Sequence, residues 1–582
     1  MSILKRNLEF CLPTASTVSN IFQLLFKRKD IILLACFVFF LAACKDDKSE
    51  VEETIVMKTP TADVINISEN PDGTILYFSW HHVAGAGGYQ FSLYIVNEAG
   101  EILEVVGEEN EVVTGISTNR PLKMATYYKM VLKTLGSEAK NTADALESTI
   151  IFWDNVPPDL PPGAIFIPRG TNLTRYFMNN TVHAQESDAD VLYYALIAGG
   201  NYTMGGVGED DNLYMGLRSV EIFGTDKNNL AKIKVVNGAF VSDGGGLILK
   251  NLELDYSEFV SESATTTVLL MNPTRNPEAT TVQRSGRDDT FVPVPMATPV
   301  GFISCKITRL RFSLFFDGNN AVSRYLVGHF LIDDCIIGYD VDNYNAPCLR
   351  FDVSLPKDIT IKNSTFYNEK ILQINVTAVD EYYQLRLLRV SESSHAAQFS
   401  EALPDWTGGN LLITNCTFYQ FSKGRYPCIA PIANGRGGAQ AFNFVGNNGA
   451  STPFAQTTDT KTVTNCVIVD SFEWNERGGR IPPAEGLIVP PQKGGGNCFV
   501  SRLFMGNAVR TADNNTYWHN DAFHPSNVMA TPEPGATNQL RDASDTYIET
   551  DPELIYLGNG QFTMTGAEQI ARGTGDPRWL NK

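Results

Sequence analysis

Three short segments in the second half of the chain alternate apolar with polar residues. They are "PCLRFDV" from residue 347, "ILQINV" from residue 371 and "SKGRYPCIAPI" from residue 422. Neighbouring side chains of a β-strand point to opposite faces, so burial of the apolar positions turns the polar ones outward. The polar positions in these strands and at their entry are Arg350, Asp352, Gln373, Asn375, Lys423 and Arg425. They predict a polar strip with cations in it, suited to binding a polar ligand.

A recurring pattern indicates how these strands are positioned. The order hydrophobic, polar, Asn, Cys, hydrophobic in "LLITNCTFYQF" (411–421) returns with close substitutes in "LIDDCII", "ITIKNSTF", "TVTNCVI" and "GGNCFV". The clearest steps between Asn positions are 29–32 residues, a period that predicts a strand-rich solenoid. The position holds Asn251, Ser304, Asp334, Asn363, Asn415, Asn465 and Asn497. Steps near 50 residues leave room for a rung without the Asn, and "LRLLRVSES" falls almost midway between residues 363 and 415.

The Asn and the Cys of the repeat have separate roles. Asn adopts the left-handed backbone conformation more readily than other non-Gly residues, so it can turn a sharp corner, and its amide can bond to the next rung. The following position holds Cys305, Cys335, Cys416, Cys466 and Cys498, with Leu252 and Ser364 as variants. Because these cysteines share one column instead of joining distant loops, we expect free thiols that fill the core beside the corner.

The composition bounds the rest of the molecule. A chain of 582 residues is too long for one compact domain. The formal charge of −19 and the pI near 4.9 argue against a nucleic-acid partner, because phosphate binding needs a basic surface. The seven His residues form no HExxH motif. We expect a monomeric β protein of two to four units that binds no nucleic acid.

The N-terminal segment has the features of an export signal. Basic residues at 27–29 precede an apolar run at 31–43 that is too short to span a bilayer. "LAAC" at 41–44 resembles a bacterial lipobox, and the "KDD" after it resembles the lipoprotein export signal of Bacteroidetes. The resemblance implies a signal peptide at 1–43, a lipid on Cys44, an acidic tether at 44–56 and display on the outer membrane, facing the exterior. The alternative is a plain signal peptide or a buried helix.

Short alternating runs at 57–155 predict a β-sandwich. Trp80 on an early strand, Gly88-Tyr89 at the start of the next and Tyr127-Tyr128 before "KMVLKTL" resemble the landmarks of a fibronectin type III module. The resemblance implies a spacer, since nothing in the loops converges on chemistry. "VPPDLPP" at 156–162 predicts a semi-rigid polyproline linker after this unit.

The repeat resembles the right-handed parallel β-helix of the pectate lyase superfamily. "ALIAGGNYTMGG" (195–206) and "GLRSVEIFGTDK" (216–227) resemble its opening rungs, and "GDPRW" (575–579) resembles the ending of Bacteroidetes surface β-helix proteins without an assigned function. The resemblance implies an all-β chain: an N-terminal β-sandwich, then a right-handed parallel β-helix at 163–500, then final rungs and a C-terminal cap at 501–582. A cap is expected because exposed β-helix ends invite edge pairing.

The resemblance also assigns roles to the polar strip. In this superfamily the substrate groove lies outside the sheet that follows the Cys-bearing strand, so Arg350, Asp352, Gln373 and Asn375 are expected to bind substrate. Lyases of this fold use a Lys or Arg base and a Ca²⁺ ion that offsets a uronate charge. These roles fall on Arg425 or Lys423 for the base and on Asp340 and Asp352 for calcium. The family's Trp-x-Asp-His stretch is absent, which puts catalysis in doubt.

Three functions remain open. The first is a surface lipoprotein that binds a polysaccharide along the groove, and the second is a polysaccharide lyase that acts on a uronate-containing glycan. The third is an adhesin or structural solenoid with a protein partner. A glycosidase would need paired carboxylates, but in the adjacent pair Asp333-Asp334 the second residue occupies the corner column. A basic, aromatic-lined outer sheet favours the first two functions, and a hydrophobic one favours the third.

Overall fold

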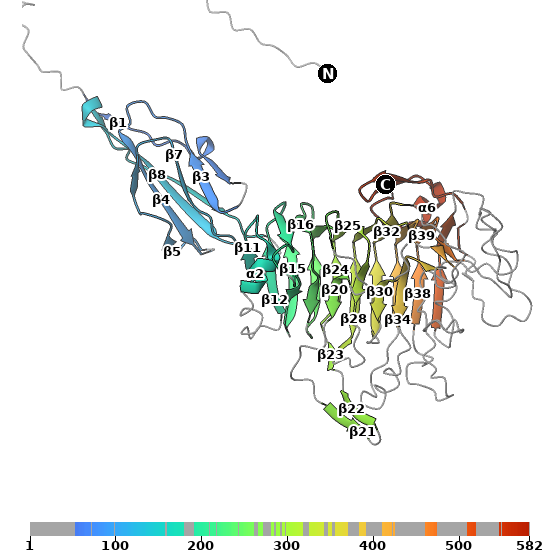
Figure 1. The fold of residues 1–582 in the computed structure, drawn as a ribbon. Helices are drawn as coiled ribbons and strands as arrows, with labels where there is room; N and C mark the ends of the chain where they lie inside the picture. The colour runs from blue at the N-terminus through green and yellow to red at the C-terminus, as the bar shows by residue number, and fades with distance from the viewer. Residues whose placement is uncertain are drawn as a thin grey trace, which may run out of the picture.

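The computed structural model consists of two all-β units that follow one another along the chain (Figure 1). It describes residues 53–70, 73–97, 99–157, 160–179, 191–208, 210–216, 218–242, 244–260, 266–271, 281–284, 287–291, 294–296, 298–317, 325–342, 347–351, 356–370, 383–390, 410–421, 423–424, 460–473, 509–518, 546–548 and 550–580. The predicted signal peptide and lipidation site, Cys44, lie outside these residues.

A β-sandwich forms the first unit. One sheet has the order β2 (Asn66–Glu69), β3 (Ile75–Ser79), β7 (Ser117–Pro121), and the other has the order β10 (Thr149–Asp154), β8 (Tyr127–Leu135), β4 (Gly88–Val96), β5 (Ile102–Val105), with β6 (Glu111–Val113) also paired to β4. Every second side chain of β4 and β8 enters the core between the sheets. The predicted landmark Trp80 is buried there, with its ring 5.3 Å from that of Tyr89. β1 (Ile55–Val56) pairs with β9 (Thr142–Ala143), so the unit begins inside the segment predicted to be a tether.

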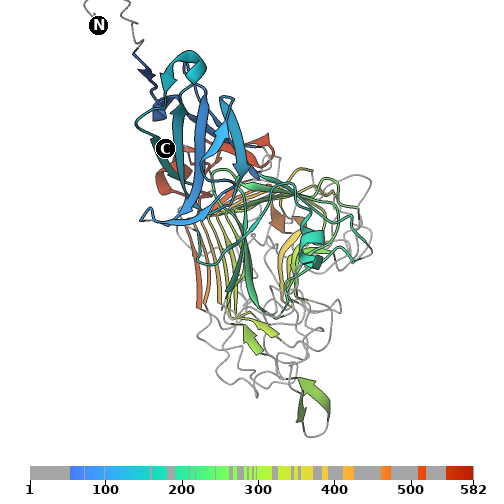
Figure 2. The ribbon, with the colours of Figure 1, turned by 90° about the vertical axis from the view of Figure 1, so that its left-hand side faces the viewer.

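Three parallel sheets enclose the core of the second unit (Figure 2). The ten-stranded sheet runs β11 (Ile165–Ile167), β12 (Val191–Leu196), β15 (Ser219–Gly224), β18 (Leu247–Lys250), β24 (Val300–Ile303), β28 (His329–Asp333), β31 (Asp358–Lys362), β35 (Asn410–Thr414), β38 (Thr460–Thr464), β41 (Val509–Asp513). The nine-stranded sheet runs β13 (Asn201–Met204), β16 (Ala231–Val235), β19 (Leu252–Asp255), β25 (Lys306–Leu310), β29 (Ile336–Tyr339), β32 (Thr365–Asn368), β36 (Thr417–Tyr419), β39 (Val467–Val469), β42 (Thr516–Trp518). The six-stranded sheet runs β14 (Leu213–Tyr214), β17 (Phe240–Ser242), β20 (Thr267–Met271), β26 (Ser313–Phe316), β30 (Pro347–Phe351), β34 (Arg386–Val390). The predicted fold, a right-handed parallel β-helix behind a β-sandwich, is confirmed.

Smaller elements lie beside these sheets. Helix α2 (Leu173–Asn179) buries Leu173 and Phe177 against the first rungs. The hairpin of β21 (Thr281–Arg284) and β22 (Arg287–Phe291) projects away from the β-helix (Figure 1). β23 (Val294–Met296) pairs with β27 (Tyr325–Val327), and β37 (Lys423–Gly424) lies between β33 (Tyr383–Gln384) and β40 (Phe472–Glu473).

The long steps of the repeat come from insertions and not from an extra rung. β31 pairs directly with β35, across the step of about 50 residues that the sequence left open. The segment "LRLLRV" forms β34, which pairs with β30 in the six-stranded sheet. The interpretation of "LRLLRVSES" as a hidden rung is therefore wrong: it is the third strand of the same rung as β31 and β32.

The predicted Asn corner is present between the ten-stranded and nine-stranded sheets. Every described residue of the column has a left-handed backbone, with φ from 49° to 56°. Side-chain bonds join neighbouring rungs, as from the Asn415 amide to the Asn363 side-chain oxygen (3.1 Å). After Asn465 the next member is Asn514, whose amide donates to Asn465 (2.8 Å). The assignment of Asn497 to that place is wrong, and Asn497 itself lies outside the described residues.

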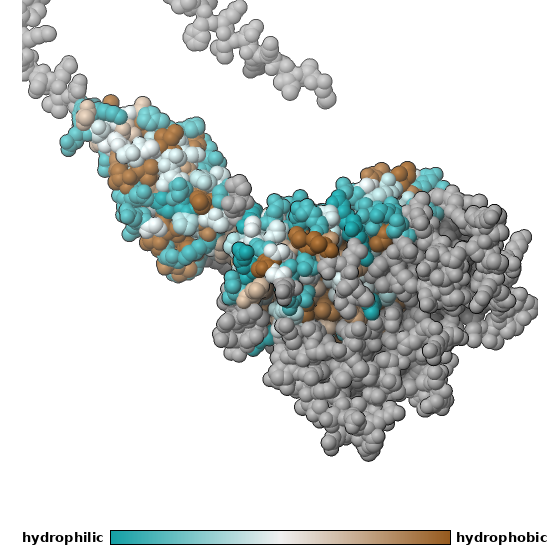
Figure 3. Space-filling model, viewed as in Figure 1, coloured by the Kyte–Doolittle hydropathy of each residue, from teal (hydrophilic) through white to brown (hydrophobic). Residues whose placement is uncertain are grey.

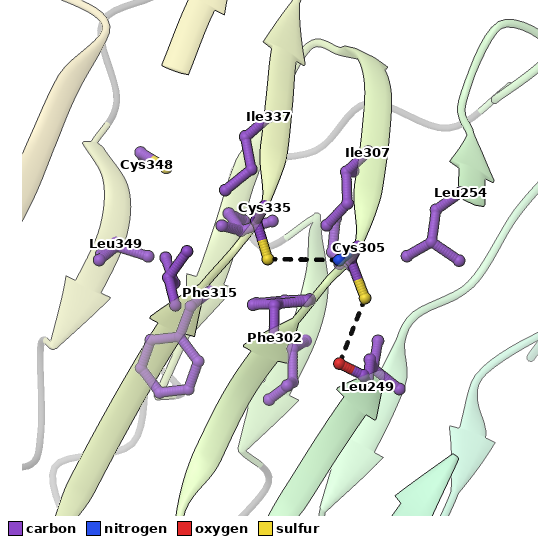
Figure 4. Close-up of a cluster of buried hydrophobic side chains, with 14 of the residues drawn as sticks. Leu249, Leu254, Phe302, Cys305, Ile307, Phe315, Cys335, Ile337, Cys348 and Leu349 are labelled. Atoms are coloured by element: carbon purple, nitrogen blue, oxygen red, sulfur yellow. Dashed lines mark hydrogen bonds between the residues drawn. The ribbon is translucent and has the colours of Figure 1, made fainter. Parts of the chain in front are cut away.

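The cysteine column fills the core beside the corner (Figure 4). The Cys305 N–H donates to Cys335 Sγ (3.5 Å), and the Cys305 thiol donates to the Leu249 carbonyl (3.2 Å). Burial raises the pKa of Cys335 and Cys416 well above the ordinary value of a thiol. The described cysteines of the column are free and buried, as predicted: Cys305, Cys335, Cys416 and Cys466. Cys348 of β30 is also free and buried, and Cys498 lies outside the described residues.

The C-terminal segment, residues 546–580, returns along the outside of the nine-stranded sheet, and we call it the tail. Thr516 of β42 bridges to Ile548, which extends that sheet at its end. The chain continues through the hairpin β43 (Leu554–Gly558) and β44 (Gln561–Met564) and then helix α6 (Ala567–Arg572). Tail residues Leu554, Phe562, Met564 and Trp579 form one buried cluster with Ile336, Tyr367, Val467 and Val469. The tail thus covers a flank of the β-helix as well as its end.

The "GDPRW" motif attaches the tail to the corner. Asp576 is fully buried, accepts a hydrogen bond from the Thr365 hydroxyl (2.6 Å) and pairs with the Arg578 guanidinium (2.5 Å). Burial raises the pKa of Asp576 above its ordinary value, although Arg578 and Thr365 oppose that rise. The Arg578 guanidinium also donates to the main-chain carbonyls of Asp334 (3.1 Å), Cys335 (2.7 Å) and Asn363 (3.0 Å). One tail arginine therefore joins two successive rungs.

Candidate functional site

The outer faces of the three sheets differ in what they offer a ligand. The tail covers the later strands of the nine-stranded sheet. On the ten-stranded sheet, polar side chains of neighbouring strands interact with one another. His329 Nδ1 lies 3.0 Å from the Asp358 carboxylate, and the Asn410 amide donates a hydrogen bond to Asp358 (2.9 Å). The Thr460 N–H then donates to the Asn410 oxygen (2.9 Å). The six-stranded sheet is the one on which the sequence places the groove.

Backbone register aligns one position from successive strands of the six-stranded sheet, beside the positions that enter the core. We call these five positions, from β17, β20, β26, β30 and β34, the outer column. They are Val241, Leu270, Phe316, Arg350 and Arg389. Two residues of the column, Val241 and Phe316, are also fully buried. The neighbouring inward positions are Phe240, Leu269, Phe315, Leu349 and Leu388, all buried in the core. The outer column thus changes from apolar residues to two arginines toward the later rungs.

Arg350 is the described cation of this column, and its predicted outward orientation agrees with the burial of its neighbours. Leu349 and Phe351 are fully buried, whereas Arg350 is half-buried. Its guanidinium carbon lies 4.0 Å from the centre of the Phe316 ring, and Phe316 is itself buried. A guanidinium that lies over an aromatic ring is held in place through its face. The Nε atom of Arg350 is buried.

The residue that aligns with Arg350 on the next strand of the six-stranded sheet differs from the expected one. The sequence assigns Gln373 and Asn375 to the adjacent strand, but β30 pairs with β34, whose Arg389 aligns with Arg350. The strand beside β30 is therefore β34, and the assignment of Gln373 and Asn375 to that place is wrong. Gln373, Asn375 and the other predicted substrate residue, Asp352, lie outside the described residues.

The predicted catalytic bases are only partly described. Lys423 begins β37, which pairs with β33 and β40 in a small sheet separate from the three long ones. Arg425 lies outside the described residues. The assignment of proton abstraction to either residue therefore stays a prediction.

The predicted calcium ligand Asp340 is surrounded by cations. Its carboxylate lies 3.0 Å from Lys370 Nζ and 3.5 Å from an Arg311 Nη. In the part of the chain that the structure describes, no three His, Cys, Asp or Glu side chains form a group that could hold a metal ion. Since the second proposed ligand, Asp352, is outside that part, the calcium site stays a prediction.

Phe316 and Arg389 are members of the column that the sequence reasoning missed. The signal for Arg389 is present: "LRF" at 349–351 and "LRV" at 388–390 repeat the order hydrophobic, Arg, hydrophobic. Interpretation of "LRLLRVSES" as a separate rung conceals this match. Phe316 precedes Asp317 at the end of β26 and gave no signal beyond its place in an apolar strand.

Comparison with known proteins finds two domain matches, neither with an assigned function. A domain of unknown function, DUF4992, matches residues 19–198, and a second one, DUF4957, matches residues 200–369. The boundary between them falls between β12 and β13, inside the first rungs and not between the two structural units. No curated protein matches the chain. Among the described residues, no helix is long and apolar enough to span a membrane.

Proposed function

We propose that this chain is a surface lipoprotein whose β-helix binds an acidic polysaccharide along the outer column of the six-stranded sheet. The observation that carries the proposal is the pair of arginine positions on successive rungs, with Arg350 stacked on Phe316. Most surface charge on this protein is expected to be negative, given a net charge of −19. Two arginine positions that register aligns on neighbouring strands suit carboxylate or sulfate groups.

Strand spacing supports a polymer as the ligand. Neighbouring strands of a sheet lie about 4.8 Å apart, which is close to the length of one sugar ring in an extended chain. Two arginine positions that register aligns on successive rungs therefore have the spacing of anionic groups on neighbouring sugar units. Because stacking already restricts the Arg350 side chain, less conformational entropy is lost when a ligand binds.

Binding without cleavage fits the described residues better than catalysis does. Proton abstraction beside a uronate needs a positioned base and a group that offsets the carboxylate charge. The described part of the outer column offers the guanidinium of Arg350, a group that suits binding of an anion. The lipid on Cys44 and the exterior location belong to the proposal and are supported by the "LAACKDD" motif.

The test is a panel of acidic and neutral polysaccharides with the mature chain. We expect retardation in native gels that contain acidic glycans, with no new reducing ends and no rise in the ultraviolet absorbance of unsaturated uronates. Arg350→Gln should weaken binding about tenfold or more, because a charge-assisted hydrogen bond contributes about 1.5–3 kcal/mol. Arg175→Gln removes an exposed arginine from α2 and is the matched control.

The alternatives have different outcomes in the same experiment. A rise in absorbance that requires Ca²⁺ and is lost in Arg425→Ala would show a lyase. Equal retardation of the protein by neutral and acidic glycans, unaffected by Arg350→Gln, would contradict the role of the outer column. Binding to no glycan at all would favour the adhesin hypothesis.

A further inference from the structure

The outer face of the larger sheet of the β-sandwich carries exposed apolar side chains along its two edges. On its two edge strands, five large apolar side chains are between 36% and 65% exposed. We call them the sandwich patch: Ile102, Leu103 and Val105 of β5, and Ile150 and Phe152 of β10. Figure 3 shows apolar surface on the sandwich in the region of β5. Exposed apolar side chains that gather on one face are uncommon and mark contacts with another surface.

Cross-strand register places a lysine between the two edges of the sandwich patch. Phe152, Lys129, Tyr94 and Val105 occupy one row across β10, β8, β4 and β5. The Lys129 ammonium lies 5.7 Å from the centre of the Phe152 ring and 6.0 Å from that of Tyr94. An ammonium held among apolar groups can reach an anionic group at the rim while its stem stays in apolar contact.

The size of this face argues against a stable dimer. Four strands about 4.8 Å apart, with about seven residues each on average and a rise of 3.4 Å per residue, give a flat area of roughly 450 Å². A stable protein interface needs about 800 Å² from each partner. A weak surface suffices, however, when a tether already holds the partner at a high effective concentration.

The chain before the sandwich provides such a tether. Ten residues, 45–54, separate Cys44 from β1, and extended chain of that length spans at most about 35 Å. Strands β4 and β8 have nine residues, so the sandwich is about 30 Å long. A lipid on Cys44 therefore keeps every part of the sandwich within reach of the membrane.

We propose that the sandwich patch lies on the membrane surface that holds the lipid, with its apolar side chains at the interface and Lys129 beside headgroup phosphates. This inference rests on the lipid anchor of the proposed function. Apolar side chains and a long cation on one face are the combination that favours a lipid–water interface. The sandwich then orients the β-helix relative to the membrane and is more than a spacer.

The test uses the lipidated chain in vesicles of phosphatidylethanolamine and phosphatidylglycerol. Cys428 and Cys498 are replaced by Ser, and one fluorophore is attached to Val112→Cys, on the same outer face as the sandwich patch. The control label is Tyr77→Cys, exposed on the opposite sheet. Spin-labelled lipids should quench the label at 112 several times more than the label at 77, and Ile150→Ser with Phe152→Ser should remove that difference.

The failures can be told apart. If the chain does not float with the vesicles, the lipid anchor fails. If it floats but both labels are quenched equally, the anchor stands and the patch proposal is overturned. If two labelled copies transfer energy to each other in vesicles without spin label, and Phe152→Ser removes the transfer, the patch binds a second copy and the membrane proposal is also overturned.

Discussion

The two halves of the nine-stranded sheet carry the same kind of side chains on the inner face and different kinds on the outer face. In the first four strands the outward side chains are polar: Asn201, Thr203, Lys232, Lys234, Glu253, Asp255, Lys306 and Thr308. In the last five strands they are mostly apolar or hydroxyl-bearing, among them Ile336, Thr365, Tyr367, Thr417, Tyr419, Val467, Val469, Thr516 and Trp518. The first set faces solvent, and the tail packs on the second.

Each half is stabilised in a different way. In the open half, ion pairs join rungs, such as Lys306 with Glu253 at 2.9 Å. Exposed pairs of this kind contribute about 0–1 kcal/mol. In the covered half, aromatic side chains such as Phe562 of the tail are removed from water, and each contributes about 1.5–3 kcal/mol. The repeated corner and core residues therefore determine that a rung forms, and its outward residues determine whether the tail covers it.

Removing the attachment of the tail should have the largest effect. Arg578→Met leaves the carboxylate of Asp576 buried without its cation, at a cost of about 3–5 kcal/mol. We expect the tail to leave the sheet, so that chemical unfolding shows a separate early transition and a protease cuts the tail. The control Arg572→Met removes a partly exposed pair with Glu568 and should cost under about 1 kcal/mol. Equal losses in the two variants would contradict the role of Arg578.

The corner should matter equally in both halves. Asn363 in the covered half and Asn251 in the open half have φ of 50° and 55°. Alanine at a left-handed position costs about 1–2 kcal/mol and loses a hydrogen bond of about 1 kcal/mol. Asn363→Ala and Asn251→Ala should therefore each lower the free energy of unfolding by about 2–3 kcal/mol, measured in denaturant. The glycine variants should recover about half of that loss, and a glycine variant as unstable as alanine would contradict the strain argument.

A buried thiol in the core of the β-helix should make its free energy of unfolding fall at alkaline pH. Burial raises the pKa of Cys348 from 9.0 to about 12. The folded state keeps this proton above pH 9.0 while the unfolded state loses it, so stability falls as pH rises from 9.0 toward the folded value. At about pH 10 this loss is about 1.4 kcal/mol. Cys348→Ala should reduce the slope of unfolding free energy against pH, and an unchanged slope would show that the thiol is not responsible.

The smallest effect is expected on the open half. Lys306→Gln removes its pair with Glu253 and should cost about 0.5–1 kcal/mol, less at high salt. Lys232→Gln, which changes an exposed lysine of the same column, is the control. A salt-independent loss above about 2 kcal/mol would mean that the open half depends on more than surface ion pairs.

The rungs were predictable because their signals are local. A left-handed corner needs Asn or a close substitute, and the buried position beside it needs a small side chain, so both recur at each rung. The corner after Asn465 is wrongly predicted at Asn497, because "GGNCFV" satisfies the same local pattern as "DNNTYW" around Asn514. Only pairing between strands distinguishes the two, and pairing is not a local property.

The tail and the outer column could not be predicted because they depend on distant contacts. Arg578 bonds to Cys335, 243 residues earlier, and nothing within "GDPRW" names that partner. Arg350 could be placed on an outer face from the apolar residues beside it, but its neighbour depended on the length of the insertion before β34. Alternation gives the face of a strand, and register across insertions requires the structure.

The most direct test of the account compares two arginines in one affinity gel. Wild type, Arg350→Gln and Arg175→Gln are run in gels with polygalacturonate, with a neutral glucan and with no polymer. We expect polygalacturonate to retard wild type and Arg175→Gln equally and to retard Arg350→Gln much less, with no retardation by the neutral glucan. Equal retardation of all three proteins would contradict binding of an acidic polysaccharide at the outer column.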